Sequence, residues 1–199
     1  MKACPRSLSF AVLLTIAIPL LYSCTPKNHD DHESKAENVA ATAPITAFNN
    51  VDPVVKSQLN TFLEGYFALN QALILDSLAG AKVAAVQFLE TTKKFEMSTL
   101  TGEQMDFYFV QSSKLKVALQ EISGGDDIEK ARTGLATVSE AMYALTKAFH
   151  PNESTLYYQY CPMARSNKGA NWLSVTEELV NPYMGQVMLE CGRTQEKLE

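Results

Sequence analysis

Two sulfur-rich phrases near the C-terminus contain the residues best suited to do chemistry. The first phrase is Tyr160-Cys161-Pro162-Met163-Ala164. The second is Asn181-Pro182-Tyr183-Met184-Gly185, followed closely by Met188-Leu189-Glu190-Cys191-Gly192. Thiols and thioethers are soft ligands, and a soft ligand set selects a thiophilic cation such as Cu(I). The sequence therefore predicts a soft-metal site, with copper as the leading ion, in the last third of the chain.

Five residues are the predicted metal ligands: Cys161, Met163, Met188, Cys191 and His150. Cys161 and Met163 are two positions apart in a segment expected to be extended, which places both side chains on one side. Met188 and Cys191 share one face of a short helix expected from about 182 to 191. Met184 lies on the same face, but methionine at helical spacing commonly fills a core, so a packing role is expected for it.

The same two cysteines also allow a disulfide. Of the four cysteines, Cys4 leaves with a signal peptide and Cys24 is expected to carry lipid, so Cys161 and Cys191 are the two that remain as thiols. In an oxidising compartment two such thiols form a bridge. Both interpretations, a metal site and a Cys161–Cys191 disulfide that locks the C-terminal arm, remain open from the residues alone.

The N-terminus predicts export and lipid anchoring. Lys2 and Arg6 precede an almost wholly apolar stretch from residue 8 to 21, a length and flank pattern typical of a secretory signal rather than a membrane span. The following Leu21-Tyr22-Ser23-Cys24 resembles a bacterial lipoprotein cleavage box. Residues 1–23 are therefore predicted to be a signal peptide and Cys24 the lipidated first residue. The expected location is the envelope of a Gram-negative-type bacterium, lipid-anchored and facing the periplasm or the surface.

Composition indicates a tether and an acidic mature chain. Residues 24–50 are small, polar and poor in large apolar side chains, so they cannot bury enough surface to fold and are predicted to be a flexible tether. Loss of Lys2 and Arg6 changes the formal charge from −5 to −7. Nucleic-acid binding needs a basic face, so that class of partner is not expected. Membrane attachment is expected through the acyl chains.

Residues 51–195 are predicted to form one all-α domain. Apolar residues at spacings of three and four, with capping residues before them, predict helices over about 53–75, 78–93, 101–124 and 126–149. The fourth helix, capped by Asp126, carries a sustained seven-residue repeat of apolar positions. Four amphipathic helices with short connections predict an antiparallel four-helix bundle.

A C-terminal arm of irregular or extended chain and short helices is expected after the bundle. The run from Leu156 to Tyr160 is aromatic and favours an extended strand that leads to Cys161. Ser174 and Glu177 have the spacing of a capping box for a brief helical turn. Asn181, Pro182 and Gly192 have the start and stop residues of the short helix over 182–191.

The motifs of the common enzyme classes are absent from the sequence. It contains no nucleophile elbow, no His-Glu-x-x-His and no phosphate-binding glycine loop. Cys161 and His150 are the residue types of a nucleophile pair, but no oxyanion-hole signature accompanies them. The sequence therefore predicts a protein that is not an enzyme.

The terminal phrases also carry a family resemblance. Together with Lys168-Gly169-Ala170-Asn171-Trp172-Leu173-Ser174, the two sulfur-rich phrases resemble an uncharacterised helical domain of bacterial envelope lipoproteins. That domain of unknown function is also found fused to the periplasmic adaptor subunits of copper/silver-type heavy-metal efflux pumps. The resemblance extends over about 51–192, and the family typically carries phenylalanine in place of Met184. It implies binding of copper or a related soft metal and a connection with metal efflux. The alternative is a structural or partner-binding lipoprotein with the Cys161–Cys191 disulfide.

Overall fold

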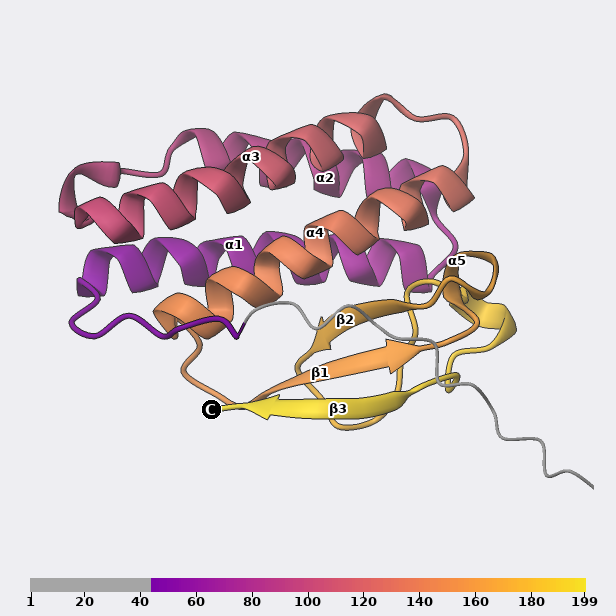
Figure 1. Ribbon diagram of the computed structural model, residues 1–199. Coiled ribbons are helices and arrows are strands. Elements are labelled where there is room, and N and C mark those ends of the chain that lie inside the picture. The colour runs from indigo at the N-terminus through magenta and orange to yellow at the C-terminus, as the bar shows by residue number, and fades with distance from the viewer. Residues whose placement is uncertain (1–43) are drawn as a thin grey trace, which may run out of the picture. The chain divides into compact units, whose positions relative to one another are not determined.

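Four long helices make up most of the structure, a computed structural model that describes residues 44–199. They are α1 (Pro53–Ile74), α2 (Leu78–Lys93), α3 (Gly102–Gly124) and α4 (Ile128–Phe149), with a short 3-10 helix, η1 (Met97–Thr99), before α3 (Figure 1). The four predicted helices are confirmed to within two residues at each end. Among the described residues, no helix is long and apolar enough to cross a membrane. The predicted signal peptide, the lipidation site Cys24 and residues 24–43 of the predicted tether lie outside the described residues.

Local capping explains where the helices begin. The Asp52 carboxylate accepts a hydrogen bond from the backbone N–H of Val54 at 2.7 Å, ahead of Pro53 at the first helical position. Helix α4 is capped by Asp127, whose carboxylate accepts from the N–H of Glu129 at 2.8 Å. The predicted cap, Asp126, instead forms an exposed ion pair with Lys130. The cap therefore lies one residue later than predicted.

The helices pack through their apolar faces. Helix α1 packs against α2 and α4, and α3 packs against the same two helices. The repeat in α4 is buried, with Leu135, Val138, Met142, Leu145 and Phe149 all at most 1% exposed. Their burial is the main source of stability for a helix of this length, because helical propensity alone is marginal.

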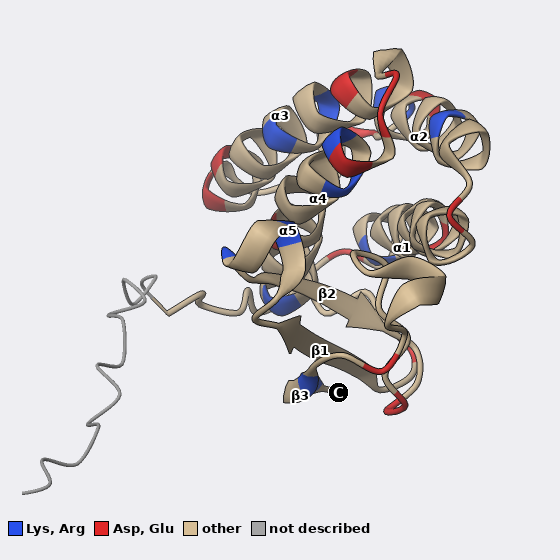
Figure 2. Cartoon of the chain, turned by 90° about the vertical axis from the view of Figure 1, so that its right-hand side faces the viewer, with Lys and Arg blue, Asp and Glu red and all other residues tan. Residues whose placement is uncertain are grey.

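The C-terminal arm is a three-stranded antiparallel sheet, which corrects the predicted all-α class. Its strands are β1 (Leu156–Cys161), β2 (Ala170–Ser174) and β3 (Arg193–Leu198), in the order β2-β1-β3. The extended segment that leads to Cys161 was predicted, but its pairing with β2 and β3 was not. The sheet lies on the side of α1 and α4 away from α2 and α3, and β2 packs against α4 (Figures 1 and 2).

The predicted short helices of the arm are mostly wrong. Between 182 and 191 the structure has turns and one 3-10 helix, η2 (Gly185–Val187), and residues 174–177 form a strand end and bends. Gly185 has a φ of 55° and Met188 an extended φ of −153°, so neither fits a continuous α-helix. A four-residue helix, α5 (Ala164–Asn167), connects β1 to β2.

The packed part of the chain begins before residue 51, ahead of the predicted end of the tether. The backbone N–H of Phe48 donates to the carbonyl of Ala148 at 2.8 Å. The ring of Phe48 lies 5.0 Å from that of Phe149, centre to centre, and Ile45 also packs against the core. Residues 44–50 therefore belong with the helical domain rather than with a flexible tether.

Candidate functional site

The structure brings the two thiols into contact. Cys161 is the last residue of β1 and Cys191 ends the loop before β3, and their Sγ atoms are hydrogen-bonded at 2.8 Å. Both are unbridged cysteines within residues 44–199. Cys161 is fully buried, whereas Cys191 is partly exposed. Thirty positions of sequence thus separate two sulfurs that share one site.

The contact changes the acidity of one thiol. The hydrogen bond with Cys161, followed by burial and the charge of Cys161, raises the pKa of Cys191 to about 11. At neutral pH Cys191 is therefore a thiol rather than a thiolate, which makes it a weak nucleophile. A metal ion that binds here must displace that proton, so metal affinity rises with pH.

The methionines are arranged differently from the prediction. Strand β1 ends at Cys161, so Met163 lies in a turn, 45% exposed, and the predicted same-side placement on a strand does not occur. Met188 is 38% exposed and lines a shallow surface hollow together with Cys191. Met184 packs against the core, which agrees with its expected packing role. Met188 therefore lies in the same hollow as Cys191.

The structure does not bring His150 to the thiols. His150 ends α4 in a left-handed conformation with a φ of 47°, and it lines a hollow with Lys147 and residues 196–199. Those residues pair with the start of β1, because Leu198 lies opposite Leu156, whereas Cys161 is the last residue of the strand. Six strand residues span roughly 17 Å. Nowhere in residues 44–199 do three His, Cys, Asp or Glu side chains gather closely enough to hold a metal ion.

The segment from Asn181 to Cys191, here called the thiol loop, is closed at its base by one residue. The side chain of Asn181 donates from Nδ2 to the carbonyl of Cys191 at 2.7 Å, and its backbone N–H donates to the carbonyl of Leu189 at 2.9 Å. Its Oδ1 accepts from the N–H groups of Tyr183 at 2.8 Å and Met184 at 3.2 Å. Asn181 therefore fixes both the start of the loop and the backbone of Cys191.

Gly192 allows the base of the loop to approach β1. Its φ is 144°, and a Cβ at this position would lie 2.7 Å from the carbonyl oxygen of Tyr160, which precedes Cys161. A side chain at residue 192 would push this segment away from β1. The glycine is therefore part of what keeps Cys191 close to Cys161.

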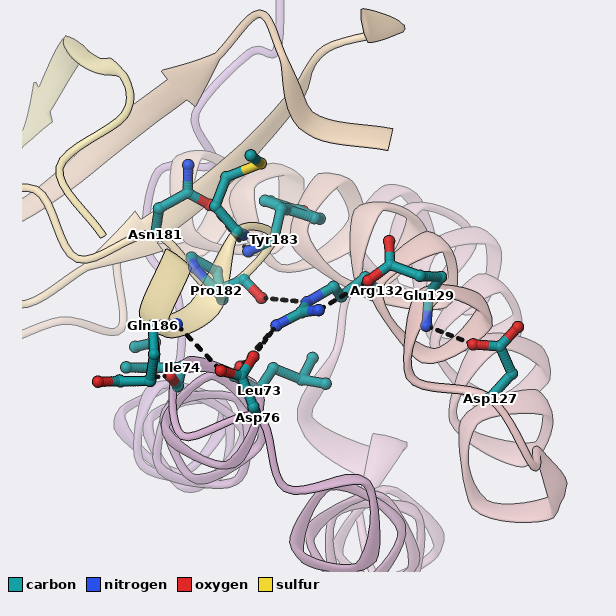
Figure 3. Close-up of polar contacts among 11 residues, drawn as sticks. Leu73, Ile74, Asp76, Asp127, Glu129, Arg132, Asn181, Pro182, Tyr183 and Gln186 are labelled. Atoms are coloured by element: carbon teal, nitrogen blue, oxygen red, sulfur yellow. Dashed lines mark hydrogen bonds and ion pairs between the residues drawn. The ribbon is translucent and has the colours of Figure 1, made fainter. Parts of the chain in front are cut away.

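The thiol loop is also held by Arg132 of α4, as Figure 3 shows. The guanidinium is buried and donates from Nε to the carbonyl of Pro182 at 3.2 Å and from Nη2 to the carbonyl of Leu73 at 3.2 Å. It also forms ion pairs with Asp76 and Glu129. One side chain thus joins α4, the end of α1 and the loop.

Asp76 completes this arrangement. Its second carboxylate oxygen accepts from the N–H of Gln186 at 3.1 Å, and the Gln186 side chain donates to the carbonyl of Ile74 at 2.8 Å (Figure 3). A Cβ on Gly185 would overlap the Asp76 carboxylate and the Arg132 guanidinium. The loop therefore lies directly on this ion pair.

A chain of hydroxyl groups attaches the loop to the interior. Tyr183 donates to the carbonyl of Asn171 at 2.7 Å and lies 3.2 Å from the hydroxyl of Ser139. Ser139 lies 2.9 Å from the hydroxyl of Tyr66, which accepts from the N–H of Leu173 at 3.0 Å. Ser139, Tyr66, Arg132 and Asp76 were not identified from the sequence as parts of a site. Tyr183, Asn171 and Leu173 belong to the phrases that carry the family resemblance, but their contacts with the interior were not expected.

The environment of Asp76 predicts a pH-dependent contribution to stability. The hydrogen bond from Arg132, then that from the N–H of Gln186, lowers the pKa of Asp76 below the usual 3.8, against a smaller opposing effect of burial. A carboxyl whose pKa is lower in the folded state contributes stability above its unfolded pKa and loses it as the pH falls through the folded value. Asp76→Asn is therefore expected to be less stable than the wild type at pH 7.

The difference in free energy of unfolding between the wild type and Asp76→Asn should shrink as the pH falls from about 4 towards 2. Urea denaturation at a series of pH values measures this difference. Asparagine suits the positive φ of 53° at this position, so the substitution adds little backbone strain. A stability difference that stays constant across this pH range would contradict the assignment.

Comparison with known proteins gives a match for the helical part alone. A family model described as "Protein of unknown function (DUF3347)" matches residues 62–154. The match includes most of α1, all of α2, α3 and α4, and ends before β1 and the thiol pair. No curated protein and no solved structure matches the chain. Residues 62–154 are thus similar to a domain family whose function is unknown.

Proposed function

We propose that this protein is a membrane-anchored envelope lipoprotein that binds a soft metal ion, Cu(I) foremost, at Cys161 and Cys191. The observation that carries the proposal is the contact at 2.8 Å between two sulfurs from separate parts of the chain. Two thiolates form a soft ligand pair, and softness is the property that selects Cu(I) over harder cations. The function so defined is to hold such an ion in connection with metal efflux or homeostasis.

Metal binding requires a small opening of the pair. With metal–sulfur bonds of about 2.3 Å, two sulfurs on one tetrahedral ion are about 3.8 Å apart, and further apart at lower coordination numbers. Cys191 is the partner able to move, because it is partly exposed and ends a loop, whereas Cys161 is buried in a strand. Met188, which lines the same hollow as Cys191, is a source of a third, thioether ligand.

The cellular setting is supported by the sequence. The Leu21-Tyr22-Ser23-Cys24 box supports lipid anchoring at Cys24, and the resemblance of the terminal phrases to domains fused to efflux-pump adaptors supports a link with metal export. The DUF3347 match agrees with that resemblance to the extent of identifying a domain of unknown function.

Competition titration against a Cu(I) chelator, under anaerobic reducing conditions, tests the metal proposal. Replacing both cysteines by serine is expected to lower Cu(I) affinity by orders of magnitude, because hard hydroxyls replace soft thiolates. Met188→Leu should lower it less, since one weaker ligand is removed and side-chain volume is nearly kept. His150→Ala is the matched control and should leave affinity unchanged. Equal affinity of the wild type and the double cysteine variant would overturn the proposal.

A second function is favoured by a different observation. Helix α3 exposes Met105, Phe109, Val110 and Val117, and the Phe109 side chain is 64% exposed. Exposed apolar side chains of this kind are typical of protein contact surfaces. In this alternative the protein is a structural or partner-binding helical lipoprotein, and a Cys161–Cys191 disulfide locks its C-terminal arm. Thiol titration of the protein as isolated, without reductant, separates the two: free thiols that disappear on adding Cu(I) favour the first, and their complete absence favours the second.

A further inference from the structure

We propose that Asn181 is a positioning residue for the thiol pair, one that sets how readily Cys161 and Cys191 act together. The interaction that suggests this is the hydrogen bond of 2.7 Å from Asn181 Nδ2 to the carbonyl oxygen of Cys191. This bond holds the backbone of Cys191 at the base of the thiol loop. The inference rests on the proposed function only where it concerns metal affinity, because disulfide formation by the same two thiols tests it independently.

The environment of Asn181 makes it a rigid support. The residue is fully buried, and the donor and acceptor ends of its carboxamide are both used, by the carbonyl of Cys191 and by the N–H groups of Tyr183 and Met184. Its backbone N–H and carbonyl are used as well, by Leu189 and Gly185. A side chain held by this many bonds has one orientation, so the carbonyl it binds is held in one place.

The backbone of Cys191 depends on this support. Its N–H makes a long hydrogen bond of 3.3 Å to the carbonyl of Met188, within the loop itself. Beyond it, Gly192 lies against Tyr160 through a close approach of backbone atoms, without a side chain of its own. Loss of the Asn181 bond would leave Cys191 held only by this long bond and, two residues further on, by the pairing of Arg193 with Tyr160, so its sulfur could move more readily away from that of Cys161.

The outer anchor of the loop supplies a matched comparison. Gln186 lies in the same loop, and its carboxamide donates to Ile74 of α1, with no hydrogen bond to either cysteine. Asn181→Asp and Gln186→Glu make the same chemical change, amide to carboxylate, in one loop. Asn181→Asp keeps the acceptor oxygen for Tyr183 and Met184 and removes the donor to Cys191. Gln186→Glu removes a donor to Ile74 and, like Asn181→Asp, adds a negative charge.

The experiment measures the equilibrium between the folded protein and glutathione. One molecule of oxidised glutathione takes two electrons from the dithiol: the Cys161–Cys191 bond forms, the glutathione disulfide breaks, and the two thiol protons leave with two reduced glutathione molecules. The equilibrium constant for disulfide formation is measured by trapping the free thiols at a series of ratios of reduced to oxidised glutathione. A purely structural role lowers the denaturation midpoint and leaves this constant unchanged, because the constant compares two folded states.

Asn181→Asp is expected to lower the equilibrium constant for disulfide formation roughly three- to tenfold, the effect of removing one hydrogen bond. Gln186→Glu should leave it within a factor of about two. Asn181→Ser, whose hydroxyl still caps the turn but is too short to reach Cys191, should follow Asn181→Asp without its added charge. These variants keep the means of capping the turn, and circular dichroism at the temperature of the titration confirms that they are folded.

Two results would overturn the inference: an unchanged constant in both Asn181 variants, or an equal fall in the Gln186 control. Cu(I) titration of the same proteins then separates this inference from the proposed function. If the Asn181 variants lower the glutathione constant while the double cysteine variant binds Cu(I) as the wild type does, the positioning role stands and the metal role fails. If the Asn181 variants leave the glutathione constant unchanged while the double cysteine variant binds Cu(I) more weakly than the wild type, the metal role stands and Asn181 has no part in it.

Discussion

Replacing Arg132 by methionine is expected to lower the free energy of unfolding by about 3 kcal/mol, the lower end for a broken buried ion pair. The guanidinium is 8% exposed, and its removal leaves the carbonyl of Pro182 without its donor, whereas the carbonyl of Leu73 still accepts from the N–H of Asp76 at 3.2 Å. An unpaired buried acceptor costs roughly 1 kcal/mol or more. Asp76 keeps 39% of its side chain in contact with water, which limits the penalty for its unpaired charge.

Urea denaturation of the reduced proteins measures the effect, with Lys130→Met as the control. Lys130 lies on the same helix and also pairs with an aspartate, but the two side chains are 70% and 86% exposed. An exposed pair of this kind contributes less than about 1 kcal/mol, so the control should unfold almost as the wild type does. If both variants lose the same small amount of stability, Arg132 is not the anchor of the thiol loop.

The four helices could be predicted from the sequence because local signals and burial agree there. Apolar residues at helical spacing become the core face, as in α4, and residues such as Asp52 and Pro53 mark the start of α1. The same kind of start and stop residues predicted a helix over 182–191, and that prediction is wrong. Asn181 does cap backbone N–H groups, as an N-cap residue would, but a turn and a 3-10 helix follow it. The contact with Asp76 and Arg132 decides that conformation, and it involves α1 and α4, far away in the sequence.

The sheet could be predicted only in part for a related reason. Strand β1 is rich in aromatic residues and has a local signal, so its extended form was expected. Strand β3 is polar, with charged residues at 193, 196 and 197, a composition typical of an edge strand and not of a buried one. Its pairing with β1 is a tertiary contact, which no local pattern reveals.

The candidate site shows the same division. The proximity of Cys161 and Cys191 was expected and is observed. The expected placement of Met163 fails because strand β1 ends at Cys161, and that of Met188 fails because the helix over 182–191 does not form. His150 was included for its residue type, and the strand order places it at the far end of β1. Composition therefore identified the reactive atoms, and only the fold could show which of them meet.

Oxidation of the thiol pair is expected to raise the free energy of unfolding by about 3.5 kcal/mol. The bridge would close a loop of about thirty residues, and the chain-entropy relation for a loop of that size gives this value. The gain arises mainly in the unfolded state, which loses conformations when its chain is cross-linked. Urea denaturation of the oxidised and reduced wild type measures the gain. The double cysteine-to-serine variant, which should unfold identically with and without reductant, is the control.

This gain also determines which proposed function the pair can serve. Thermodynamic linkage makes the stabilisation of the fold by the bridge equal to the stabilisation of the bridge by the fold. A gain of about 3.5 kcal/mol therefore means that folding favours the disulfide over two thiols by a factor of several hundred. If the proposed copper site lies in an oxidising compartment, Cu(I) must reach the pair while it is still reduced, or arrive with a reductant. A gain below about 1 kcal/mol would mean that the fold does not hold the two thiols together, and it would contradict the contact on which both functions depend.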